Sequence, residues 1–328
     1  MTMRLLPLLV LAAGLSGSGA LAQDGAPVFS LPIACEPGRT CAVPSYMDND
    51  AGPGAKDYRC GSRSYDAHKG VDIRILNYPA MRAGVAVLAA APGKVRVIRD
   101  GMEDLSIRDR VGGTGNQDCG NVAIIDHANG WATQYCHMRK GSVRVKAGDV
   151  VKAGDPIGLV GLTGNTEFPH LHFMAWRGNT VIDPFAYGAA AGACSGGRSL
   201  WSPAAAAKLE YRPREVLGAG FASAALDMAG VDAGNITAPT RNTALVAYVR
   251  ALGLKAGDTP LLSLRGPDGA AMADTLPSPL PRDQAQRLTF VGRTRVPPGG
   301  WPPGVYRAHY TVRREGRIVL ERQFELKL

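Results

Sequence analysis

The sequence predicts a mainly β protein, in which an antiparallel β-sheet domain is followed by a small β-sandwich of immunoglobulin-like type. Residues 59–190 contain short Val, Ile and Ala runs separated by Gly, Asp and Asn, a strand-and-turn pattern without an amphipathic helix. From about residue 216, short apolar runs recur at intervals that suit sandwich strands. Between Tyr306 and Val312, apolar residues alternate with polar ones, which predicts a strand with one buried face.

The N-terminus predicts export. Residues 1–22 combine a basic start, a short apolar stretch and the small-residue sequence Ala20-Leu21-Ala22, the pattern of a secretory signal peptide cleaved after Ala22. The apolar stretch is too short to span a bilayer, so we expect no stable membrane anchor. We therefore expect the mature chain in the periplasm, an oxidising compartment that permits disulfides.

Composition divides the rest of the chain. We expect residues 23–58 to be a polar, irregular extension, 59–194 the first domain, 195–215 a linker with a short helical piece, and 216–328 the sandwich domain. The tetrapeptide Lys-Ala-Gly-Asp occurs at 146–149, 152–155 and 255–258, where we expect the same tight turn three times.

The six cysteines fit three disulfides in an oxidising compartment. Two of them flank a Pro-Gly turn, two flank a β-hairpin, and the last two would tie the ends of the first domain. The expected pairs are Cys35–Cys41, Cys119–Cys136 and Cys60–Cys194. A zinc site built from cysteines is the alternative, which the absence of a CxxC motif disfavours.

The positive charge is concentrated in the C-terminal part of the chain. The formal net charge is +9, but residues 23–200 hold 19 basic and 17 acidic side chains, whereas residues 201–328 hold 17 and 11. Because no aromatic–basic motif or recognition helix accompanies this charge, we expect no nucleic-acid partner. We expect the C-terminal domain instead to hold the protein near an anionic envelope surface.

The histidines carry the clearest chemical signal. His68 and Asp72 stand four residues apart, so in an extended segment they point to the same face. In Pro169-His170-Leu171-His172-Phe173, a strand would place both histidines on one face and the apolar residues on the other. A polar sheet face is the simpler interpretation of such a His-x-His pair.

Together, these residues offer two imidazoles and one carboxylate. Three protein ligands and one open position are typical of a catalytic zinc site, and the spacing leaves open whether His170 or His172 is the third ligand beside His68 and Asp72. His137, at the end of a strand, is then a candidate acid or base. His127, at a hairpin turn near the expected groove, and His309, on a polar strand face, are expected to be exposed.

Several segments resemble the lysostaphin/LytM-type metallopeptidases, the M23 peptidase family. They are YDAHKGVDI, AAAPGKVRVIRDG, the YCHM segment, VKAGDVVKAGDPIGLVGLTGN, FPHLHF and VIDP, which together cover about residues 58–190. The segment Arg99–Asp118 is longer than the family's usual hairpin, so it could form a wall or cover of the groove. The 23–58 extension could also cover the groove.

The resemblance implies specific roles. It assigns His68, Asp72 and His172 as zinc ligands, and His137 and His170 as the histidines that activate water and stabilise the developing charge. It implies a zinc-dependent endopeptidase that cleaves peptide cross-links of bacterial peptidoglycan. The alternative is a catalytically inactive or latent envelope protein that binds peptidoglycan or activates another cell-wall hydrolase. Besides peptidoglycan, a regulatory protein is a candidate partner.

Overall fold

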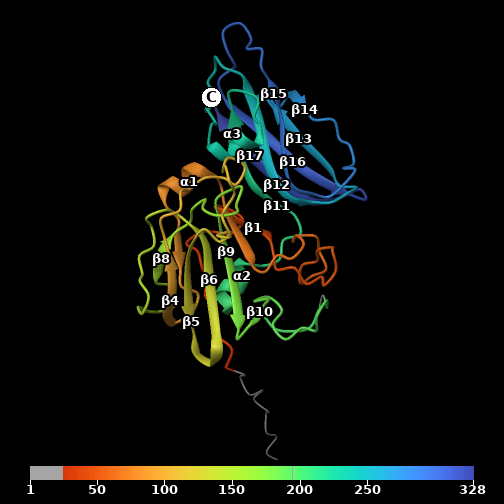
Figure 1. The fold of residues 1–328 in the computed structure, drawn as a ribbon. Helices are drawn as coiled ribbons and strands as arrows, with labels where there is room; N and C mark the ends of the chain where they lie inside the picture. Colours follow the sequence, from red (N-terminus) through yellow and green to blue (C-terminus); the bar gives the residue numbers. More distant parts are fainter. Residues whose placement is uncertain (1–24, 194) are drawn as a thin grey trace, which may run out of the picture.

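The structure is a computed structural model that describes residues 25–193 and 195–328. Strands dominate these residues, so the mainly β prediction is confirmed. An eight-stranded sheet fills the lower half of the molecule in Figure 1, and two smaller sheets fill the upper half. The predicted signal peptide, residues 1–22, lies outside the described residues. Within the described ranges, no helix is long and apolar enough to cross a bilayer.

The eight-stranded sheet is antiparallel, and its strand order brings distant histidines together. In spatial order it contains β1 (Cys41–Ser45), β2 (Val71–Ile75), β9 (His170–Arg177), β6 (Trp131–Met138), β5 (Asn121–Asp126), β4 (Gly93–Arg99) and β7 (Val150–Val151), with β10 (Thr180–Ile182) paired to β9. A separate two-stranded sheet pairs β3 (Ala86–Leu88) with β8 (Pro156–Leu159), and the 3-10 turn η1 (Ala128–Gly130) joins β5 to β6. Because β2 lies beside β9, the segment after His68 runs against the His-x-His strand.

The 23–58 segment is more regular than its composition suggests. It supplies β1, which pairs with β2 at the edge of the large sheet. Phe29 and Ile33 are buried in the same hydrophobic core as that sheet, together with Leu200 and Trp201 from the expected linker. Composition missed this because isolated apolar residues among Pro, Gly and Asp give no periodic signal. The domain boundaries themselves remain a prediction.

Residues 59–190 contain one short α-helix, which is not amphipathic and so agrees with the strand-and-turn pattern. Helix α1 (Tyr78–Ala83) begins at Asn77, whose side chain accepts a hydrogen bond from the Ala80 N–H, and ends at Gly84. Only Met81 in this helix is buried, so no amphipathic period was visible. The expected linker helix is present as α2 (Pro203–Lys208).

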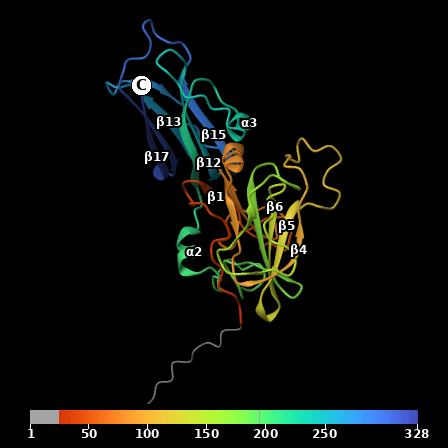
Figure 2. The same ribbon diagram turned by 90° about the vertical axis from the view of Figure 1, so that its left-hand side faces the viewer.

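Two sheets share one hydrophobic core in the C-terminal half. The three-stranded sheet contains β11 (Glu215–Ala222), β12 (Leu245–Leu254) and β15 (Gln284–Arg293); the four-stranded sheet contains β14 (Ala271–Asp274), β13 (Thr259–Arg265), β16 (Val305–Arg314) and β17 (Arg317–Lys327). Tyr306 and Val312 of β16 are buried as expected. An immunoglobulin-like topology remains a prediction. A helix that the sequence did not predict, α3 (Met228–Ala233), lies beside α1 at the junction of the two halves (Figure 1, Figure 2).

Two of the expected disulfides are present, Cys35–Cys41 and Cys119–Cys136. The third expected pair includes Cys194, which lies outside the described residues, so that pairing remains a prediction.

The three Lys-Ala-Gly-Asp segments form the same turn, as predicted. In each, the aspartate N–H donates to the lysine carbonyl at 3.0–3.1 Å. The lysine N–H donates to the aspartate carboxylate at 2.8–2.9 Å. The glycine has a φ between 83° and 95°, which other residues rarely adopt. The third turn differs from the others because its Asp258 is buried and also accepts hydrogen bonds from Arg214 and Arg314.

Replacing Asp258 with asparagine should destabilise the protein by about 3 kcal/mol at neutral pH, because it leaves Arg214 without its buried partner. Burial alone would raise the pKa of Asp258, but hydrogen bonds from Arg214, Lys255 and Arg314 lower it below its usual value. Its stabilisation is therefore present above about pH 4 and is lost as the pH falls through the lowered pKa. Thermal unfolding of both proteins between pH 7 and pH 3 should show a Tm difference that shrinks at the acid end.

Asp149→Asn is the matched control, because it removes the same carboxylate charge at the same turn position, where no buried arginine pairs with it. Equal loss of stability in the two variants would contradict the assigned role of the arginines.

Candidate metal centre and active site

The register of β2 against β9 places four polar side chains on one face of the sheet. Asp72 lies opposite His172, and Arg74 lies opposite His170. Directly opposed residues in antiparallel strands point to the same face. Leu171, between the two histidines, is fully buried in the core on the other face, as the alternation predicted.

Three potential ligand atoms converge at this face. The Nε2 atom of His68 lies 3.2 Å from Asp72 Oδ1 and 3.2 Å from His172 Nδ1. The His172 Nδ1 atom lies 2.9 Å from Asp72 Oδ1. Tetrahedral zinc with bonds of about 2.0–2.1 Å would hold its ligand atoms about 3.3 Å apart. The two imidazoles and one carboxylate therefore fit zinc in donor type and in spacing. Among the described residues, this is the group whose ligand atoms converge closely enough to hold a metal ion.

The surroundings of the cluster fix its orientation. His68 Nδ1 donates to the Tyr46 carbonyl at 2.7 Å, which leaves the Nε2 lone pair facing Asp72. The Tyr65 ring stacks on His68 with the ring centroids 4.2 Å apart. Gly70 leaves room for His172, since a Cβ atom at Gly70 would lie 2.7 Å from the imidazole.

His137 and His170 lie beside the three ligand candidates, with their ring centroids 4.5 Å apart. His137 Nδ1 donates to the Thr163 carbonyl at 2.7 Å. His170 Nδ1 donates to the Phe168 carbonyl at 2.9 Å. Because carbonyls only accept, each Nδ1 carries a proton, and Nε2 is the nitrogen left for chemistry.

The backbone at His137 is in the left-handed region, with φ of 60°. Non-glycine residues rarely adopt this conformation, and such strain is common at functional sites. The His137 N–H donates to the Cys119 carbonyl at 2.8 Å, and Cys119 is bonded to Cys136, the residue before His137. The disulfide therefore anchors the strained residue.

Burial and neighbouring charges shift the pKa values of several groups in the cluster. Asp72 is buried, which alone would raise its pKa, but His170 and His68 hold it well below the usual value. Burial lowers the pKa of His137 well below 6.5, and His170 and His172 lower it further. Burial also lowers the pKa of His172. At neutral pH, Asp72 is thus ionised, and His137 and His172 are neutral.

The long segment at 99–118 is hydrogen-bonded to the chain that leads into β9, and its expected role as a wall or cover of the groove remains a prediction. The Ile107 N–H donates to the Thr166 carbonyl at 2.8 Å, and Asp104 accepts from the Leu162 N–H at 2.7 Å. The segment thus braces the chain that leads into β9. The 23–58 segment contributes the Tyr46 carbonyl to the site and no residue to the three-ligand group.

The remaining two histidines lie outside the cluster. His127 is only half-buried, but both ring nitrogens are engaged, by the Pro92 carbonyl and the Thr133 hydroxyl. It directly follows β5, at the opposite end of the β5–β6 hairpin from His137, so it lies away from the histidine cluster and its expected place near the groove was wrong. His309 pairs with Glu321 at the surface, as expected.

Several supporting residues were not identified from the sequence. Arg74 alternates with Asp72, so the strand period could have placed it on the same face. The carbonyls that hold the histidines belong to the main chain of Tyr46, Thr163 and Phe168. Because every residue type has such a carbonyl, the sequence cannot reveal them.

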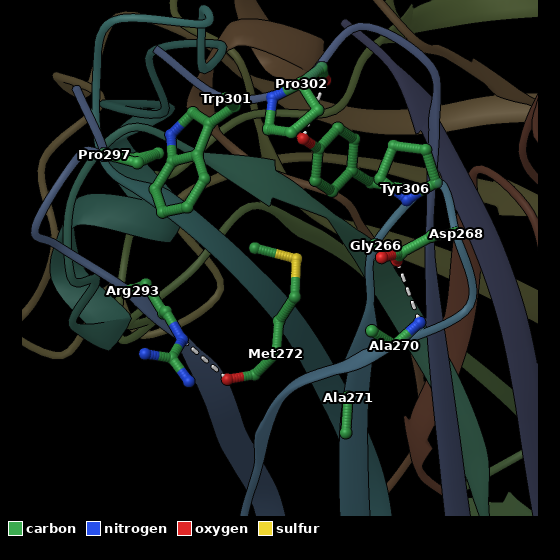
Figure 3. A pocket seen from close by; sticks show the side chains of 11 residues that line it. Gly266, Asp268, Ala270, Ala271, Met272, Arg293, Pro297, Trp301, Pro302 and Tyr306 are labelled. Carbon is green, nitrogen blue, oxygen red and sulfur yellow. Dashed lines mark hydrogen bonds between the residues drawn. The ribbon is translucent and has the colours of Figure 1, made fainter. Parts of the chain in front are cut away.

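A cavity of about 390 Å³ lies elsewhere, in the C-terminal half. Figure 3 shows Met272, Trp301 and Tyr306 around it, with the Tyr306 hydroxyl turned to the Pro302 carbonyl. The Trp301 indole N–H donates to the Thr243 carbonyl. No residue of the histidine cluster lines this cavity.

Part of this chain is similar to known peptidases. Residues 66–184 match the family model described as peptidase family M23. An uncharacterized metalloprotease from Buchnera aphidicola subsp. Baizongia pistaciae is 45% identical over 65 residues, 20% of this chain and 17% of that protein. Peptidoglycan DD-endopeptidase ShyB from Vibrio cholerae serotype O1 is 32% identical over 116 residues, 35% of this chain and 22% of ShyB.

The chain thus spans about a fifth of the length of these curated relatives. Among solved structures, the catalytic domain of the antimicrobial peptidase lysostaphin from Staphylococcus simulans is 27% identical, with a TM-score of 0.28. That match covers 43% of this chain and 85% of the lysostaphin domain.

Proposed function

We propose, from the premise that residues 66–184 form a domain of peptidase family M23, that this protein is a zinc-dependent endopeptidase that hydrolyses peptide cross-links of bacterial peptidoglycan. The observation that carries the proposal is the convergence of His68, Asp72 and His172 beside a second pair of histidines. A structural histidine pair would not need an ionised, buried carboxylate between two imidazoles.

His68, Asp72 and His172 would hold the zinc. Bound zinc supplies a Lewis acid that polarises a carbonyl and activates water for attack. Tyr46 keeps the proton of His68 on Nδ1, which leaves Nε2 available as a ligand. Gly70 keeps the space that the His172 ring occupies.

His137 and His170 would move protons and bind the developing negative charge. Because His137 is neutral at neutral pH, its Nε2 can accept a proton, and its Nδ1–H bond to Thr163 keeps the ring in place. His170 is held in the same tautomer by Phe168. Of two imidazoles side by side, one can accept a proton during the attack of water and the other can donate a proton to the leaving amine.

The name of ShyB, together with the family match, points to peptidoglycan as the substrate. The two disulfides fit an oxidising compartment, so we place the protein in the cell envelope, exported to the periplasm. The basic C-terminal half fits an anionic envelope surface.

Incubation of the purified protein with cell-wall sacculi, followed by mass spectrometry of the released fragments, tests the proposal. We expect fragments with cut cross-links, no release in the presence of a chelator, and recovery on adding zinc. Undiminished release in the chelator would exclude the metal, and intact sacculi under every condition would exclude the substrate.

A further inference from the structure

Arg74, on the same face as the histidine cluster, is held by residues of the C-terminal half of the chain. Arg74 is almost fully buried, on the same face of β2 as Asp72 and opposite His170. Its guanidinium carbon lies 4.0 Å from the centre of the Phe168 ring. The Phe168 carbonyl accepts the Nδ1–H of His170 and also a hydrogen bond from the Thr166 hydroxyl at 2.8 Å. Arg74 thus packs on the residue that sets the tautomer of His170.

The partners of Arg74 belong to the other half of the molecule. Its guanidinium pairs with Asp232 of α3 and donates to Gln286 of β15 at 3.0 Å. Arg250 of β12, which is also buried, pairs with the same carboxylate and donates to the Leu76 carbonyl after β2. One carboxylate therefore serves two buried guanidinium groups, and no other acid pairs with either of them in the described residues.

A parallel set of contacts reaches His68. Glu215 of β11 forms a buried ion pair with Arg63 at 2.8 Å. The Arg63 carbonyl accepts the Tyr46 N–H at 2.7 Å, and the Tyr46 carbonyl holds His68. The C-terminal half therefore supports the site at two points, of which the Asp232 route ends at His170 and the Glu215 route ends at His68.

We propose that Asp232 is a positioning residue for hydrolysis: through Arg74 and Phe168 it holds His170 in its working orientation, so the C-terminal half is a part of the active-site support. This proposal rests on the proposed function for its activity readout. A docking contact without this role would affect stability alone.

The test compares the full-length protein with Asp232→Asn, Asp232→Glu and Gln286→Leu. We expect Asp232→Asn to lower kcat on sacculi about 10-fold or more, with KM and zinc content near the wild-type values, because a misplaced catalytic group slows the reaction without weakening binding. Asp232→Glu should recover part of the rate. Gln286→Leu removes a hydrogen bond to Arg74 but no charge, so we expect a smaller fall in kcat. This variant serves as the test if the Asp232→Asn protein does not fold.

The matched control is Asp274→Asn, which breaks an aspartate–arginine pair in the same half but away from the junction. Nitrogen NMR of the six histidines in metal-free protein gives a readout independent of activity. The His170 Nδ1–H signal should exchange faster in Asp232→Asn and be unchanged in Asp274→Asn.

An unchanged kcat with an unchanged His170 signal would overturn the proposal, as would equal effects of Asp232→Asn and Asp274→Asn. If the wild-type protein cleaves nothing, the proposed function fails, and the NMR comparison alone then decides the positioning role.

Discussion

Replacing His68 with alanine should abolish cleavage of purified sacculi, lowering the rate by about 10³-fold or more, which is about 4 kcal/mol in activation free energy. The reason is geometric: His68 Nε2 is one of only three donor atoms in the converging group, and Asp72 and His172 alone leave a two-ligand site. Zinc content of the purified variant, measured by mass spectrometry, should fall with the activity.

His309→Ala is the control for this variant, because His309 is an exposed histidine paired with Glu321 outside the cluster. Its activity and zinc content should equal those of the wild type. A His68→Ala protein that is folded, as judged by circular dichroism, and that still cleaves sacculi at the wild-type rate would refute the metal assignment.

Replacing His137 with alanine should lower kcat by about 10²- to 10⁴-fold, the usual contribution of a positioned acid or base. Unlike His68, His137 lies outside the three-ligand group, so zinc content and KM should stay close to the wild-type values. Steady-state kinetics and metal analysis of the same preparation separate these quantities.

His127→Ala is the matched control, since His127 stands on the same hairpin and uses both ring nitrogens in hydrogen bonds. It should keep full kcat. Loss of zinc from His137→Ala would instead make this residue a ligand and would contradict the division of roles given above.

The local patterns in the sequence were sufficient for much of this site. Alternation in β9 placed His170 and His172 on one face because the strand period is two. The Lys-Ala-Gly-Asp turns were predictable because their hydrogen bonds lie within four residues. The resemblance to the M23 family selected His172 over His170 as the third ligand candidate, which spacing left open, and in the structure His172 is the one grouped with His68 and Asp72.

Other features required the tertiary structure. Helix α1 is too short to show a helical period. The 23–58 segment joins the large sheet through β1, a pairing that no local sequence pattern predicts. The expected place of His127 near the groove failed because its distance from the site depends on which end of the hairpin faces the cluster. The carbonyls of Tyr46 and Phe168 act independently of their side chains, so composition cannot reveal them.

The sequence by itself therefore determined the β architecture and singled out the histidines and the single carboxylate that we propose to carry the chemistry, because period and residue type are local properties. Only the tertiary structure decided how these groups are held. Asp232 and Arg74 are 158 residues apart, and their pairing depends on how the two halves pack together. That packing makes the C-terminal half, which carries no recognisable motif, a neighbour of the histidine cluster.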